Sequence, residues 1–401
     1  MEETSTGPAT ILQFRQDIEE QLRRHIREAL DVALAEELAA ALASNRHERT
    51  DQRRGYRNGS RARTITTPDG PRIVDVPRGR IVDTGGATQE FRSQLLPRYA
   101  RRTRAIDDAI LGCYLGGVNS RRIRTALKPL LGERHLSKSA VSRIVARLKA
   151  LFAAWQDRDL ATERYAVIFF DGFHLKVRMA KRVISVPVLA ALGVAENGQK
   201  CVLQLRLAAS EAEVTWSAVV TDLQQRHLSA PLLLVVDGNG GLKNALKQWE
   251  GVRIQRCTTH KLENLKAHCP SHARAEMKRD YDRIIYADDG LAARAASDAF
   301  VKKWATLGPS VAKSLQEAGP ELLTFYAFPK ETWKSIRTTN TIENLNREFR
   351  RRTKTQASFG TEAAALTVLY GLVAFGQIQL RKIDGHKQWP SFLEKEWQKV
   401  A

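Results

Sequence analysis

Two aspartates each follow a run of apolar, largely β-branched residues and precede a glycine. Asp171 lies in the stretch VIFFDG, and Asp237 lies in LLVVDG. Such runs are typical of buried strands, so we expect one strand to end at each aspartate. If the two strands are neighbours, both carboxylates come within reach of one divalent cation, which prefers oxygen ligands. The alternative is that each aspartate only begins a turn, as aspartates before glycine often do.

A third acid, Glu343, lies near the start of a basic helix expected in TIENLNREFRRRTK. A helical wheel at about 100° per residue places Glu343 on the basic side of this helix, beside Arg347 and Arg350. Glu348 falls on the opposite flank and is expected to have no functional role. The residues of the apolar side are Ile342, Leu345 and Phe349. An alternative role for Glu343 is a capping box with Asn340, which stands three residues before it.

Asp171, Asp237 and Glu343 together could hold two Mg²⁺ ions, for which Mn²⁺ is expected to substitute. Such ions would activate a water or a 3′-hydroxyl and stabilise the leaving oxygen in phosphoryl transfer. Arginines beside the metals would hold a DNA backbone close to the reaction. The arginines expected to contact DNA from this helix are Arg347, Arg350 and Arg351.

The charge of the chain indicates a polyanionic partner. Its 401 residues carry 64 Lys and Arg against 44 Asp and Glu, a net charge of +20. Neutralising phosphates and releasing their counterions favours binding to double-stranded DNA. The basic residues do not gather beside an apolar face, and no run approaches the length of a membrane span, so no membrane partner is expected. The N-terminus does not resemble a signal peptide and cysteines are few, so we expect a cytoplasmic, nucleoid-associated protein.

The N-terminal part is expected to consist of a helix, a basic arm and a hairpin. Apolar residues recur at helical spacing over residues 11–44. The basic stretch NRHERTDQRRGYRNGSRART follows, either as a partly extended arm on DNA phosphates or as a solvated loop. A short hairpin is expected in TITTPDGPRIVDVP, with its turn at Asp69 and Gly70.

Three helices are expected between residues 105 and 155. Asn119 and Ser120 could cap RRIRTALKPLLG, which Gly132 would end, and Ser137 could cap KSAVSRIVARLKALFAAW. Two helices joined by a tight turn are typical of a helix-turn-helix, although such pairs also occur as structural corners. The second helix would present five residues to DNA: Lys138, Ser139, Ser142, Arg143 and Arg147.

The rest of the chain predicts an α/β layer followed by helices. Three hairpin-linked strands, a helix, a strand, a helix and a short strand in VRIQRC form a mixed sheet. Residues 262–328 are expected to be helical throughout. After the basic helix, one more apolar helix leads into a basic tail.

The stretch CTTHKLENLKAHCPSH raises the question of zinc. Cys257 and His260, and then Cys269 and His272, have the pair spacing of a zinc site. The gap between the pairs is short for a zinc finger. The alternative is a packed cysteine and a hydrogen-bonded histidine that brace the end of a strand.

Seven ordered blocks of this sequence resemble one family. They are YRNGSRART to VPRGR, RYARRTRAIDDAILGCYLGGVNSRRI, SKSAVSRI, FFDGFHLKVR, VVDGNGGLKNAL, RCTTHKLENL and FPKETWKSIRTTNTIENLNREFRRRTKTQASF. Between residues 45 and 385 the chain is similar to the Mutator-type transposases of bacterial insertion sequences. Two local departures are Asn239, where many relatives have histidine, and Glu263, where arginine is usual.

The resemblance implies a ribonuclease-H-like catalytic core with an all-helical insertion before its final glutamate. It assigns the acidic triad to Asp171, Asp237 and Glu343, and it gives Cys257 and His260 a structural role without zinc. It also implies binding to terminal inverted repeats and target DNA, and a copy-out route through a circular intermediate. Pairing two transposon ends requires at least a homodimer, for which the N-terminal helix is a candidate. The predicted segments are an N-terminal helical segment (1–50), a basic arm with hairpin (51–104), a helix-turn-helix domain (105–160), the first part of the core (161–260), the insertion (261–335), and the second part of the core with a basic tail (336–401).

Two alternative functions are a DNA-binding regulator and a nuclease without strand transfer. A DNA-binding regulator that keeps this fold without chemistry would be expected to lack one of the three acids, and all three are present. A ribonuclease-H-like nuclease without strand transfer would not need the predicted DNA-binding region. The sequence contains no P-loop and no G-x-S-x-G motif, so neither nucleotide hydrolysis nor a serine-hydrolase mechanism is indicated.

Overall fold

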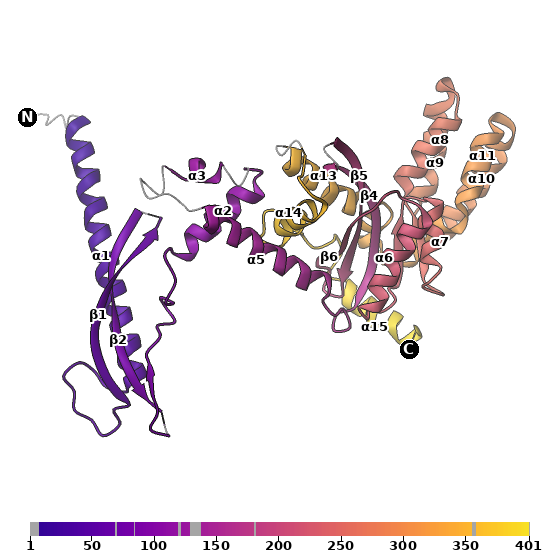
Figure 1. Ribbon diagram of the computed structural model, residues 1–401. Coiled ribbons are helices and arrows are strands. Elements are labelled where there is room, and N and C mark those ends of the chain that lie inside the picture. The colour runs from indigo at the N-terminus through magenta and orange to yellow at the C-terminus, as the bar shows by residue number, and fades with distance from the viewer. Residues whose placement is uncertain are drawn as a thin grey trace, which may run out of the picture. The chain divides into compact units, whose positions relative to one another are not determined.

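The computed structural model describes residues 8–68, 70–83, 85–118, 122–128, 138–179, 182–354 and 358–400 (Figure 1). The chain forms two compact units. One consists of Met1–Tyr114 and Val118–Val145, and the other consists of Leu115–Gly117 and Ala146–Ala401. Within the described residues, no helix has both the length and the apolar composition needed to cross a membrane.

The first unit begins with a long helix and a hairpin. Helix α1 (Pro8–Leu42) confirms the predicted N-terminal helix, and its Leu34 joins a small core with hairpin residues Ile65 and Val74. Strands β1 (Gly55–Thr67) and β2 (Gly70–Val82) pair antiparallel, and β3 (Thr88–Glu90) adds to β2.

The hairpin is longer than the sequence predicted. Half of the basic stretch lies in β1, so from Gly55 onward it is a strand of the hairpin and not a solvated loop. The sequence did not indicate this because most residues of β1 are exposed or only partly buried, and its basic residues hide the strand pattern. The contact of the basic stretch with DNA phosphates stays a prediction. Asp69 of the predicted turn lies outside the described residues.

Three helices follow in the predicted region: α2 (Arg104–Leu115), α3 (Ile123–Ala126) and α5 (Lys138–Gln156). They share a core that includes Ile106, Ile123 and Val141. The predicted capping and stop residues Asn119, Ser120, Gly132 and Ser137 lie outside the described residues. The helix-turn-helix therefore stays a prediction.

The second unit contains the mixed sheet that the sequence predicted, in the strand order β6-β5-β4-β7-β8. Its strands are β4 (Tyr165–Met179), β5 (Arg182–Ala195), β6 (Lys200–Leu207), β7 (Leu233–Val236) and β8 (Arg253–Arg256). The first three pair antiparallel, whereas β7 is parallel to both β4 and β8.

Helices pack on the two faces of this sheet. Helices α6 (Glu213–Gln225) and α7 (Gly240–Leu246) share one core with β4, through contacts such as Phe170 with Trp216. Alternate residues of a strand point to opposite faces, so the neighbouring Phe173 faces the other way. There it stacks on Phe349 of α13 (Asn340–Thr353), with ring centroids 5.7 Å apart. Helix α14 (Glu362–Ala374) contacts β6 and β4.

A block of helices separates β8 from α13. It contains α8 (Thr258–His268), α9 (Arg274–Ile285), α10 (Gly290–Leu307), α11 (Pro309–Ala318) and α12 (Trp333–Ile336), with short 3₁₀ turns between them. The predicted helical region is confirmed, and it begins at Thr258 instead of Leu262 because α8 follows β8 almost directly. The block returns to its starting point, where the Thr258 N–H donates to the Arg337 carbonyl at 3.0 Å.

The predicted basic tail contains a further helix, α15 (Trp389–Val400). Trp389 is fully buried and stacks near Phe328, with ring centroids 6.4 Å apart. The lysines of α15 hide its apolar side when the segment is judged by its charge alone.

Candidate active site

Asp171 and Asp237 lie at matching positions on neighbouring strands. The parallel pairing of β4 with β7 includes Phe169 opposite Val235, and each aspartate lies two residues further on. Neighbouring strands are about 4.8 Å apart, and residues two apart share a face. The expectation of adjacent strands is therefore confirmed.

The expectation that a strand ends at Asp171 is wrong. Strand β4 continues to Met179, and Asp171 pairs with Ala190 of β5. The strand that does end near Asp171 is β7, the other neighbour of β4, which stops at Val236. Asp237 does follow the end of its strand, as predicted.

Asp171 is partly buried and hydrogen-bonded on both oxygens. Its Oδ1 accepts the Gly172 N–H at 2.9 Å, and its Oδ2 accepts the side-chain amide of Asn346 at 2.8 Å. Burial, together with the charges of Glu343 and Asp237, raises its pKa to about 7, although the Asn346 hydrogen bond acts in the opposite direction. The charges of Glu343 and Asp237 therefore reach Asp171.

Gly238 lets a buried arginine approach the turn after Asp237. Gly238 has φ +97°, and a Cβ there would lie 2.4 Å from the Arg256 guanidinium. The turn is closed by the Asn239 N–H, which donates to Asp237 Oδ1 at 2.8 Å. Asn239 also caps α7, since its side chain accepts the Leu242 N–H. This local bonding fixes the backbone that carries Asp237.

Glu343 lies in the first turn of α13, where its carboxylate accepts a hydrogen bond from the Thr339 hydroxyl. Thr339 is the N-cap residue and Asn340 is already helical. The Asn340 N–H contacts the Thr338 hydroxyl at 3.4 Å. The capping-box alternative for Glu343 is therefore wrong, because the helix begins one residue earlier than that spacing requires.

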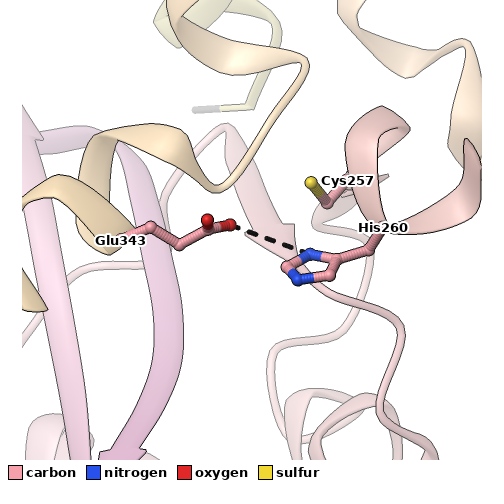
Figure 2. Close-up of side chains that lie close together, drawn as sticks. All are labelled: Cys257, His260 and Glu343. Atoms are coloured by element: carbon pink, nitrogen blue, oxygen red, sulfur yellow. Dashed lines mark ion pairs between the residues drawn. The ribbon is translucent and has the colours of Figure 1, made fainter. Parts of the chain in front are cut away.

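Cys257 and His260 lie beside Glu343, as Figure 2 shows. His260 Nδ1 is 3.8 Å from the Glu343 carboxylate. The hydrogen bond to Cys257, opposed by burial and aided by the Cys257, Glu343 and Asp237 charges, raises the pKa of His260 to about 9. Burial raises the pKa of the Cys257 thiol, but hydrogen bonds from His260 and Thr339 outweigh it and lower the pKa below its usual value. Both shifts are those expected of a cysteine and a histidine that are hydrogen-bonded to each other.

Among the described residues, the metal-capable group whose ligand atoms all lie within 4.8 Å of one another is Cys257, His260 and Glu343. The Thr339 hydroxyl already contacts all three, at 3.1 Å from the Cys257 sulfur and 3.3 Å from His260 Nδ1. A metal bound there would have to displace a buried hydroxyl. Cys269 and His272 do not belong to this group, so the four residues with the spacing of a zinc site do not come together.

The predicted DNA-contact residues lie on exposed helix surfaces where they are described. Arg347, Arg350 and Arg351 are exposed on α13, with Arg347 bonded to Asn344 and Arg351 to Glu348. Glu348 thus pairs with arginines on its flank, and the apolar side Ile342, Leu345 and Phe349 is buried as predicted. On α5 the residues Ser139, Ser142, Arg143 and Arg147 are exposed, and Lys138 begins the helix.

Comparison with known proteins gives the family. Residues 3–379 match the family model described as Transposase, Mutator family. This chain belongs to the Mutator family of transposases. Its relatives in that family include the transposase for insertion sequence element IS406 of Burkholderia multivorans, with 33% identity over 88% of this chain and 89% of the relative.

Further relatives extend the comparison to other bacteria. The transposase for IS905 of Lactococcus lactis is 31% identical over 91% of both chains. The transposase for IS256 in transposon Tn4001 of Staphylococcus aureus is 27% identical over 87% of this chain and 85% of the relative. Among solved structures, the Drosophila P element transposase strand transfer complex matches at 11% identity and a TM-score of 0.30, covering 79% of this chain and 87% of that one, which is too low to define a shared fold.

Sequence reasoning missed two residues of this Mutator-family site, Thr339 and Asn346. Both are fully buried polar residues that bond to a predicted triad acid. For Asn346 a signal existed, since the helical wheel places it between the apolar side and Glu343. Thr339 stands directly before the helix, at the position where threonine commonly caps, but its contact with Cys257 could not be foreseen.

Proposed function

We propose that the protein is an insertion-sequence transposase that binds terminal inverted repeats and catalyses DNA strand cleavage and strand transfer. The observation that supports this most is the matched position of Asp171 and Asp237 on adjacent strands, with Glu343 close enough to raise the pKa of Asp171. The mixed sheet that carries the acids supports a ribonuclease-H-like core.

The donor set fits Mg²⁺. All three side chains are carboxylates, the ligands that this cation prefers, and their mutual repulsion is what a bound cation would relieve. When bound, two Mg²⁺ ions would activate the attacking oxygen and stabilise the leaving oxygen of a phosphodiester. Asp171, Asp237 and Glu343 would hold the ions.

The surrounding residues hold these acids in place. Asn346 fixes one oxygen of Asp171, and Thr339 fixes the carboxylate of Glu343. Cys257 is 1% exposed, so it cannot reach a substrate and braces Thr339 and His260 instead. Arg347, Arg350 and Arg351 would contact the DNA backbone beside the acids, and the α5 residues would contact the element end.

The finer parts of the proposal concern assembly and pathway. Pairing two element ends requires a homodimer, and the route would be copy-out through a circular intermediate. The six predicted segments give each part its role, from end binding in residues 1–160 to chemistry in residues 161–260 and 336–401.

An assay of end nicking tests the proposal. The substrate is a duplex carrying one end of the element that encodes the protein, and the variants are Asp237→Ala and Glu343→Gln. We expect Mg²⁺-dependent nicking by the unchanged protein and a loss of at least about a thousand-fold in each variant, because each removes a metal ligand. Fluorescence anisotropy should show that both variants still bind the duplex.

Equal nicking by all three proteins would overturn the assignment of the acids. A protein that binds the end but never cuts it would instead favour a DNA-binding regulator. Cutting of DNA without joining to a target would favour the nuclease.

A further inference from the structure

A groove in the first unit has six arginines among its sixteen lining residues. It lies between the β1–β2 hairpin and the segment that follows β3, and its volume is about 680 Å³. Backbone bonds hold that segment against β1, since the Thr66 N–H donates to the Arg101 carbonyl and the Thr103 N–H donates to the Thr66 carbonyl, both at 2.9 Å. The groove is therefore a formed feature of the fold. We call it the arginine groove; its arginines are Arg61, Arg63, Arg78, Arg92, Arg98 and Arg101.

One arginine builds the wall of this groove. The Arg63 guanidinium donates to three backbone carbonyls of the facing segment: Leu96 at 3.3 Å, Pro97 at 3.0 Å and Ala100 at 2.5 Å. Burial, and next the charge of Arg61, lower the pKa of Arg63. Arg63 thus fixes the shape of the groove and leaves the other arginines to face solvent.

The charge in the groove is not balanced by the protein. Glu90 is the one acid among the lining residues, and it lies 3.7 Å from Arg78 and 3.9 Å from Arg98 in exposed ion pairs. Among the described residues, the side chains of Arg61, Arg92 and Arg101 have no hydrogen-bond or ion-pair partner. Like charges gathered in one hollow repel one another, so an anion with several charges would stabilise the site.

The size and lining of the groove favour an extended ligand. A volume of about 680 Å³ is far larger than one phosphate ion needs, and it matches ligands of many atoms. Arginine is suited to phosphate because its planar donors bind two oxygens at once. Tyr99 lines the same groove and is 85% exposed, which places an aromatic surface beside the arginines.

We propose that the arginine groove binds the sugar-phosphate backbone of duplex DNA. This rests on the proposed function only in that the DNA would be an element end. The contact is separate from the predicted contacts on α5 and α13, and Arg61 belongs to the basic stretch that the sequence predicted to lie on DNA phosphates. Contacts with phosphates position a duplex and do not read its sequence.

The test compares the salt dependence of DNA binding by full-length proteins. The groove variant is Arg61→Gln/Arg92→Gln/Arg101→Gln, which spares Arg63 and so leaves the wall intact. Each lost phosphate contact should flatten the slope of log affinity against log salt by about 0.9, so we expect a change of roughly two to three units. At 0.1 M salt, roughly a hundred-fold weaker binding should accompany it. The probe is a 30-base-pair duplex, followed by fluorescence anisotropy.

Two controls define the outcome. Arg279→Gln/Arg294→Gln/Lys302→Gln removes the same charge from α9 and α10 and should leave the slope nearly unchanged. The lysine version of the groove variant keeps the charge and should keep most of the slope. Thermal unfolding of each variant checks that the hairpin still folds.

The groove proposal is overturned if its variant behaves like the α9–α10 control, or if the unchanged protein does not bind the duplex. It is equally overturned if the groove variant loses affinity for duplex RNA but not for DNA. A protein whose groove variant loses DNA affinity while the unchanged protein never cuts an element end would support the groove and contradict the proposed function.

Discussion

The Thr339 hydroxyl lies between three side chains of the candidate active site. It donates to Glu343 and contacts Cys257 and His260, while the Thr339 N–H donates to the Cys257 sulfur at 3.3 Å. A fully buried hydroxyl with this many partners fixes the rotamer of Glu343, because moving the carboxylate would leave the hydroxyl unsatisfied.

Thr339→Val should therefore slow DNA cleavage by about 10- to 100-fold, the usual effect of removing a group that orients a metal ligand. It should also raise the Mg²⁺ concentration at half-maximal cleavage, whereas Thr339→Ser, which keeps the hydroxyl, should restore both. The measurement is a metal titration of end nicking. The matched control is Thr341→Val, which lies on α13 and loses a hydrogen bond to the Ser335 carbonyl of α12. Equal Mg²⁺ midpoints for Thr339→Val and Thr339→Ser would contradict this role.

At this scale the sequence predicted the acids but not the residues that hold them. Asp171, Asp237 and Glu343 each stand beside a strong local pattern, an apolar run or a basic helix. The partner of Asp171 is Asn346, and that contact depends on how α13 packs against β4 through Phe173 and Phe349. Such a contact between distant parts of the chain has no local signature.

At the scale of elements, three charged side chains join the helical block to the sheet. Lys261 of α8 and Arg256 of β8 are almost fully buried, and both pair with Glu317 of α11, at 2.8 Å and 2.7 Å. Partial burial raises the pKa of Glu317, but the hydrogen bonds and charges of Lys261 and Arg256 together outweigh it and lower the pKa to about 2. Since the folded pKa is below the unfolded value, the pairing stabilises the protein above about pH 4.5 and is lost as the pH falls towards 2.

Glu317→Gln should reduce the free energy of unfolding near pH 7 by about 1–3 kcal/mol, because two buried cations lose their counterion. This is below the usual cost of breaking a buried pair, since the Glu317 side chain is 58% exposed and partly screened. The difference from the unchanged protein should shrink below pH 4.5. Urea unfolding at several pH values measures it. Glu263→Gln, which removes an exposed pair with Lys266 on α8, should cost less than about 0.5 kcal/mol. Equal costs for the two variants would contradict the argument.

The sequence predicted helices and strands correctly where their apolar pattern was clear, and it missed them where charged residues obscured that pattern. The buried runs gave β4, β7 and the last apolar helix. The second half of β4 alternates buried Phe173, Leu175 and Val177 with exposed polar residues. The apolar run before Asp171 is the stronger pattern, so the sequence predicted that the strand ends at Asp171 instead of Met179. Charged residues obscured the apolar pattern of β1, which is rich in arginine, and of α15 in the basic tail.

At the scale of the whole molecule, the proposed pairing of two DNA ends needs two copies of the chain. Helix α1 carries partly exposed apolar residues at helical spacing, Ile18, Ile26 and Leu30. Residues four or eight apart lie on one side of a helix, so these form a stripe suited to a second copy.

Ile26→Glu/Leu30→Glu should therefore shift the protein from dimer to monomer in size-exclusion chromatography with light scattering. Val32 is 55% exposed but lies on the opposite side of α1 from Leu30, so Val32→Glu should leave the mass unchanged. Dimers of equal mass in all three proteins would show that α1 does not carry the contact.

The helical block leaves the sheet at Thr258 and returns to it at Arg337, and a backbone hydrogen bond joins these two residues. Asn346 and Phe349 hold α13 on β4. The position of α13 therefore does not depend on the number of residues between Thr258 and Arg337. The two ends of the block thus meet at one point of the sheet. We therefore expect this block to tolerate changes in length, because the Asn346 hydrogen bond and the Phe349 ring contact that hold α13 on β4 lie outside it.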